Sequence, residues 1–95
     1  MRVRSSLALI TLILTASCSG LTGDRTVVSG TGTDELLKLR SGPGLGFNVI
    51  LGLPDGTLLN RRDCVTEVGQ RWCNVALADA PRVTGYVAAD YLTNR

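Results

Sequence analysis

Leu37-Lys38-Leu39-Arg40-Ser41-Gly42-Pro43-Gly44-Leu45-Gly46 is the stretch of sequence that decides the fold. Its first four residues alternate between leucine and a basic side chain, which predicts a strand with one apolar face and one face toward water. Pro43 presets a φ of about −65° and Gly44 accepts a positive φ, so these residues predict the centre of a type II turn. A strand that ends in a glycine-rich loop suits a small barrel, because the loop folds over an otherwise open sheet edge.

Five short strands separated by turn residues are predicted, and no segment after the first 17 residues has the periodicity of a helix. The predicted strands are residues 34–40, 49–53, 57–66, 71–77 and 83–87. Leu53-Pro54-Asp55-Gly56 predicts a type I turn after the second strand, and a tight turn at 88–90 precedes Tyr91 and Leu92, which close the barrel. The expected fold class is therefore all-β, a small five-stranded barrel.

The third of these strands is unusually polar. Leu59 fits a core position, whereas Arg61 and Arg62 interrupt the apolar pattern. Because Asp63 and Glu67 are close by to balance them, the two arginines predict a solvated strand face rather than a phosphate site.

Several short motifs occur in an order that resembles the bacterial SH3 (SH3b) domain. They are Leu-x-Leu-Arg-Ser-Gly-Pro-Gly from Leu37, Asn48-Val49-Ile50, Leu53-Pro54-Asp55-Gly56-Thr57, Arg71-Trp72-Cys73-Asn74-Val75, Gly85-Tyr86-Val87 and Tyr91-Leu92. The resemblance runs from about residue 34 to 92 and implies an SH3-like barrel domain over residues 34–95. That family is a set of binding modules with varied ligands, so the resemblance implies binding without naming the ligand.

Residues 1–17 have the pattern of a cleavable secretion signal, helical where it is ordered. Arg2 and Arg4 give a positive start, residues 7–14 are an apolar run, and small residues follow at 15–17. The apolar run is shorter than the roughly 20 residues of an ordinary transmembrane helix. An uncleaved anchor or a buried helix stays open as the alternative.

Cys18 follows the small residues directly, an arrangement that resembles the lipobox of bacterial lipoproteins, although Thr15 stands where leucine is commonest. In that family the thiol receives a diacylglycerol and the signal is cut just before the cysteine. The resemblance implies a lipidated Cys18, a location in the periplasm or on the cell surface and, because Ser19 follows the cysteine, outer-membrane sorting in a Gram-negative cell. The alternative is an ordinary secreted protein that is cut near Ala16 and keeps Cys18 as a free thiol.

Residues 18–33 are rich in Gly, Ser and Thr and predict a flexible tether between the lipid and the domain. Val27 and Val28 leave open a short edge strand within this tether.

Cys64 and Cys73 flank a predicted hairpin. If Val68 and Gly69 form a two-residue loop, Cys64 lies directly opposite Cys73, within the distance that a disulfide accepts. A three-residue loop with a bulge at Gly69 would instead set Cys64 against Trp72. We expect the disulfide, because a secretion signal leads to an oxidising compartment.

The sequence offers little for catalysis. It contains no histidine, the commonest general base and the usual partner of a Ser or Cys nucleophile. Asp55, Asp63 and Asp90 are scattered, the glycines at 42–46 precede no helix, and two thiols are too few ligands for a metal. We therefore expect no enzymatic activity, no cofactor and no metal.

The charge balance argues against nucleic acid as a partner. The formal net charge is +2, and a leader that carries Arg2 and Arg4 away leaves eight basic and eight acidic side chains. A neutral chain has little electrostatic attraction for nucleic acid or for an anionic membrane.

Surface recognition is the function that this composition favours. The candidate ligand contacts are Arg40, Phe47, Trp72, Tyr86 and Tyr91. Trp and Tyr supply rigid contact area with a polar tip, which suits the mixed apolar and polar surface of peptidoglycan. Trp72 and Tyr86 are equally open to being core residues. For Arg40, pairing with a neighbouring acid is favoured over binding a ligand carboxylate.

Two functions follow as hypotheses. The first is a monomeric, lipid-anchored binding module of the cell envelope that recognises peptidoglycan or cell-wall peptides. The second is an interaction subunit or inhibitor that binds another envelope protein and has no affinity for the cell wall. In both, the membrane is contacted only through the lipid.

Overall fold

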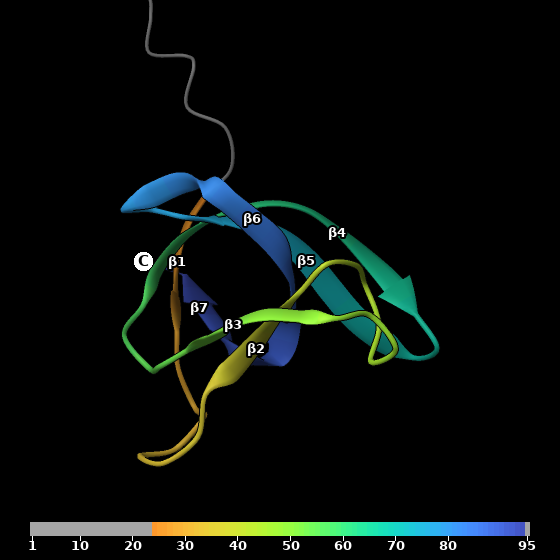
Figure 1. Cartoon of the computed structure of the whole chain (residues 1–95), viewed down its shortest axis with the longest axis horizontal. Helices are drawn as coiled ribbons and strands as arrows, with labels where there is room; N and C mark the ends of the chain where they lie inside the picture. Colours follow the sequence, from red (N-terminus) through yellow and green to blue (C-terminus); the bar gives the residue numbers. More distant parts are fainter. Residues whose placement is uncertain (1–23, 95) are drawn as a thin grey trace, which may run out of the picture.

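The computed structural model of the chain describes residues 24–94. These residues form one antiparallel sheet that curls into a half-barrel, with a single 3-10 turn before the last strand (Figure 1). The elements are β1 (Asp24–Val28), β2 (Leu37–Arg40), β3 (Val49–Leu53), β4 (Leu58–Glu67), β5 (Gln70–Leu77), β6 (Ala80–Ala88), η3 (Ala89–Tyr91) and β7 (Leu92–Asn94). Their order across the sheet is β3-β2-β6-β5-β4-β1-β7.

The all-β prediction is confirmed, but the prediction of five strands is wrong. The five predicted strands correspond to β2 through β6, and β1 and β7 are added at one side of the sheet. The strand predicted at 83–87 already begins at Ala80, because Ala78 and Asp79 alone make the turn after β5.

β1 lies where the sequence predicted a flexible tether, so that prediction does not hold for residues 24–28. The strand pairs with β4 on one side and β7 on the other, and is therefore not the edge strand that was left open. The side chains of Thr26 and Val28 are buried, and Thr26 Oγ1 donates a hydrogen bond of 2.9 Å to the carbonyl oxygen of Thr93. The predicted signal at 1–17, Cys18 and the first part of the tether lie outside the described residues.

The core fills the concave side of the half-barrel. Its main cluster contains Val28, Leu37, Leu39, Leu53, Leu59, Cys73, Val75 and Val87. Leu37 and Leu39 point into it while Lys38 between them is exposed, as the alternation along β2 predicted. Full burial of a leucine or valine side chain in this cluster contributes about 1.5–3 kcal/mol.

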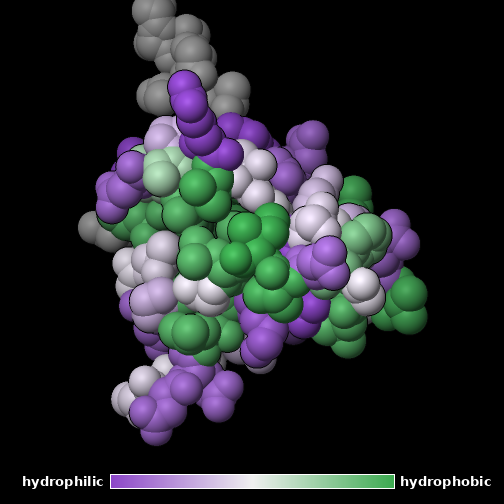
Figure 2. All heavy atoms as spheres, viewed as in Figure 1, coloured by the Kyte–Doolittle hydropathy of each residue, from purple (hydrophilic) through white to green (hydrophobic). Residues whose placement is uncertain are grey.

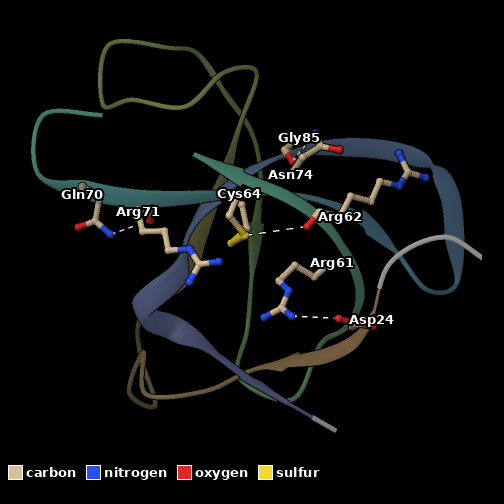
Figure 3. Close-up of a disulfide and its surroundings, with 9 residues drawn as sticks. Asp24, Arg61, Arg62, Cys64, Gln70, Arg71, Asn74 and Gly85 are labelled. Atoms are coloured by element: carbon tan, nitrogen blue, oxygen red, sulfur yellow. Dashed lines mark hydrogen bonds and ion pairs between the residues drawn. A yellow bond between two sulfur atoms is a disulfide. The ribbon is translucent and has the colours of Figure 1, made fainter. Parts of the chain in front are cut away.

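The β4–β5 hairpin has the predicted register. Val68 and Gly69 form its two-residue loop with φ values of +51° and +78°, and Cys64 faces Cys73. Two positive φ values define a type I′ turn, which matches the twist of the flanking strands. The two cysteines form a disulfide with an S–S distance of 2.04 Å and a Cα–Cα distance of 4.0 Å (Figure 3).

The turn between β3 and β4 lies one residue later than predicted. The N–H of Thr57 donates to the carbonyl oxygen of Pro54 at 3.2 Å, and Gly56 takes a φ of +91°. Asp55 at this turn accepts hydrogen bonds from the hydroxyl and the backbone N–H of Thr31, at 2.6 and 3.0 Å. These bonds lower the pKa of Asp55 below its usual value and hold the segment after β1 against the turn.

Arg61 is paired, but not with the acids that the sequence suggested. Its guanidinium lies 3.1 Å from the carboxylate of Asp24 at the start of β1 (Figure 3). The sequence pattern does not indicate this partner, because it places Asp24 in the predicted tether. An exposed pair of this kind adds little stability, about 0–1 kcal/mol.

Candidate ligand-binding groove

Three segments that are far apart in the sequence line one groove, and the first two of them lie side by side at one end of the half-barrel (Figure 1). They are the loop between β2 and β3, the tip of the β4–β5 hairpin, and η3. Together they line a groove of about 680 Å³, formed by residues 43–47 of the loop, Glu67, Val68 and Gln70 of the hairpin, and Trp72, Ala88 and Tyr91.

A smaller hollow of about 280 Å³ adjoins this groove. The two share Leu45, Trp72, Ala88 and Tyr91, and the smaller one continues along residues 35–38 to Thr31 and Arg40. The shared wall joins the two hollows into one elongated surface.

Arg40 organises the loop and has no acidic partner among the described residues. Its Nη1 donates to the carbonyl oxygens of Leu45 and Phe47, at 3.1 and 3.0 Å. Ser41 and Asn48 close the base of the loop through a backbone bond of 2.9 Å. The loop is therefore preorganised, which lowers the entropy cost of binding a ligand against it.

The predicted type II turn at Pro43 and Gly44 is wrong. Gly44 does not have a positive φ, and its N–H donates to the carbonyl oxygen of Gly42 at 3.0 Å. The ring of Phe47 folds back over the loop so closely that a Cβ at Gly42 would overlap it. Phe47 is still half exposed and lines the groove.

Trp72 is both buried and part of the site. Only 5% of its surface is exposed, yet it is absent from the main core cluster and lines both hollows. The alternation along β5 explains this, because Cys73 and Val75 point into the core and Trp72 points to the other face. Trp72 is therefore a buried residue that also lines both hollows, and its contact with a ligand stays a prediction.

The two tyrosines have different positions. Tyr91 on η3 is 38% exposed and lines both hollows. Tyr86 is half-buried on β6 opposite Asn74 and Arg40, and lines neither. Four of the five predicted ligand residues therefore gather at the site, and Tyr86 does not.

Leu45, Glu67 and Val68 belong to the groove and were missed. Leu45 is 77% exposed and Val68 is completely exposed. The available signal was an aliphatic residue inside a turn segment, where polar residues are usual. Figure 2 shows hydrophobic atoms at the right-hand end of the molecule, where Figure 1 places the hairpin tip and the loop.

Charge is distributed unevenly along this surface. Glu67 is the only charged side chain that lines the groove, whereas Glu35, Lys38 and Arg40 line the smaller hollow. Since Arg40 is committed to the loop, Lys38 is the cation that the smaller hollow presents.

A second apolar patch lies on β3, outside both hollows. Val49, Ile50 and Leu51 are between 40% and 49% exposed on a strand at the edge of the sheet. This patch provides a matched control surface for tests of the groove.

Within residues 24–94, no three Cys, Asp or Glu side chains cluster as the ligands of a metal ion would. The same residues contain no helix of the length and hydropathy that crossing a membrane requires.

Comparison of the chain with protein-family models finds no matching family, and comparisons with curated proteins and with solved structures find no match. Fold and site together describe a small, disulfide-linked, all-β domain with a preformed groove at one end.

Proposed function

We propose that this chain is a non-catalytic binding module of the bacterial cell envelope, anchored through Cys18, that recognises peptidoglycan or its peptides. Three features support the proposal. The sequence begins with the pattern of a lipoprotein signal, its motif order resembles SH3b domains, and four of its exposed aromatic and aliphatic side chains, Leu45, Phe47, Val68 and Tyr91, line one groove.

The groove is the observation that carries the proposal. Phe47, Trp72 and Tyr91 come from a loop, a strand and a 3-10 turn, and they line one elongated apolar surface with polar groups at its rim. Binding sites for small ligands and peptides combine these features: a largely preformed concave surface, mostly apolar, with a few polar groups that set orientation. Peptidoglycan stems offer short apolar side chains, amides, amines and carboxylates to such a surface.

Retention on insoluble peptidoglycan tests the binding function. The full chain is expected to sediment with purified peptidoglycan, and Leu45→Ser is expected to weaken retention about ten-fold through the loss of an apolar contact. Leu45 is suitable because its side chain is exposed and has no part in the core.

Ile50→Ser is the matched control, because Ile50 is exposed on β3 and lies outside the groove. It is expected to bind as the unchanged chain does. Absence of retention of the unchanged chain rejects the proposed function. Equal loss in both variants rejects the groove as its site and indicates non-specific apolar adsorption.

The anchor has a test of its own. The chain extracted from membranes is expected to begin at Cys18 and to carry the added mass of a diacylglycerol and an N-acyl group. Cys18→Ser is expected to shift the protein from the membrane fraction to the soluble fraction, because several buried acyl chains bind a bilayer durably and none remains. An unmodified, soluble Cys18 chain would contradict the anchor and leave the groove proposal standing.

A further inference from the structure

The most unusual backbone position among the described residues lies on the rim of the groove. Val68 has a φ of +51°, the only positive φ at a residue other than glycine in the part of the chain that the structure describes. A β-branched residue in this region is an outlier, since its side chain crowds its own backbone. Asn or Gly is the strongly preferred choice at this turn position, and Gly69 already fills the other one.

Stability does not explain the valine. Its side chain is completely exposed, so it buries no apolar surface in the free protein. The strained backbone destabilises the folded chain, and the solvated side chain adds no burial to offset that cost. Residues of this kind persist mainly where they serve a function.

The neighbours of Val68 indicate what that function is. Val68 lines the groove together with Leu45, Phe47 and Tyr91, and Glu67 next to it is the only charged side chain there. No ion pair involves Glu67 within residues 24–94. The rim of the groove thus presents an apolar contact beside an uncompensated carboxylate.

Resting on the function proposed above, we infer that the hairpin tip is a specificity element that takes a peptide segment carrying an aliphatic group next to a free amine. The aliphatic group packs on Val68, and the ammonium pairs with Glu67. Charge complementarity favours this occupant, because an anionic segment would be repelled at Glu67 and meets its cation, Lys38, only in the adjoining hollow.

Stability and binding of Val68→Asn test the inference, because its two expected effects have opposite signs. Relief of the strained φ is expected to raise Tm by roughly 4–8 °C. Loss of the apolar contact is expected to weaken binding of muropeptides, released from purified peptidoglycan by a muramidase, about ten-fold. Val68→Ile keeps both the branching and the apolar surface, and should match the unchanged chain in Tm and in affinity.

The amine is tested with the same muropeptides after acetylation of their free amines. Acetylation and Glu67→Gln should each weaken binding, and the two losses should not add, because both remove one ion pair.

The possible outcomes distinguish failure of the proposed binding function from failure of the proposed role of the hairpin tip. No binding of muropeptides by the unchanged chain rejects the proposed function and this inference with it. If Val68→Asn binds muropeptides as the unchanged chain does, or if its Tm is not raised, the proposed role of the hairpin tip is wrong and the proposed function stands. Full binding of acetylated muropeptides overturns the pairing with Glu67.

Discussion

Removal of the Cys64–Cys73 disulfide is expected to lower the free energy of unfolding by roughly 2.5–3 kcal/mol and Tm by roughly 10–20 °C. The bond closes a ten-residue loop, so its loss restores conformational freedom to the unfolded chain. A domain of this size has a total stability of only about 5–10 kcal/mol, which makes the effect large. Thermal unfolding of the full chain with and without a thiol reductant measures it.

The double variant Cys64→Ala/Cys73→Ala serves as the control. Cys73 lies in the core, so the variant also loses some packing and should be slightly less stable than the reduced chain. Reductant should have no further effect on it. If the chain with both cysteines has the same Tm with and without reductant, the disulfide does not stabilise the fold.

Gly85→Ala is expected to destabilise the domain by about 3 kcal/mol or more. Gly85 is buried on β6 beside β2, and a Cβ there would lie 2.6 Å from the carbonyl oxygen of Arg40 and 2.8 Å from Cγ of Leu39. Neither atom is the free end of a flexible side chain, so the two strands must move apart. A urea denaturation curve gives the loss directly.

Displacement of β2 in Gly85→Ala should also disturb the groove, because Arg40 of β2 binds the carbonyl groups of the β2–β3 loop. Weaker ligand binding should therefore accompany the loss of stability in Gly85→Ala. Gly46→Ala is the control, since a Cβ there meets no atom within 4 Å and the residue lacks a positive φ. Its stability should stay within about 0.5 kcal/mol of the unchanged chain. Equal stability of the two variants would contradict the close approach of β2 to β6 at Gly85.

The sequence predicted correctly those features that depend on neighbouring residues, namely the register of a hairpin and the buried face of a strand. The β4–β5 register was predictable because a two-residue loop fixes every pair along a hairpin, including Cys64 with Cys73. The alternation of Leu37 and Leu39 likewise showed which face of β2 is buried.

The errors arose where distant segments decide the structure. β1 is a strand because β4 and β7 pair with it from both sides, although its Gly- and Thr-rich surroundings predict a coil. The β2–β3 loop avoids a type II turn because the Arg40 guanidinium binds its carbonyl groups and the Phe47 ring packs over it.

The residues that line the groove were predicted only in part, because segments distant in the sequence form it. Three of the predicted aromatic residues, Phe47, Trp72 and Tyr91, line the groove, but Tyr86 lies opposite Asn74, two pairs along the ladder from Trp72 and Ala88. Leu45 and Val68 gave no aromatic signal, and only the folded arrangement shows that these two turn residues line the same groove.

Backbone amide spectra of the isotope-labelled full chain, recorded during titration with muropeptides, test the central claim most directly. We expect saturable shifts at residues 43–47, at the hairpin tip around Val68 and at η3, with the amides of β3 unchanged. Absence of shifts at millimolar muropeptide, or shifts that map to β3 instead, would contradict the groove as the binding site of this chain.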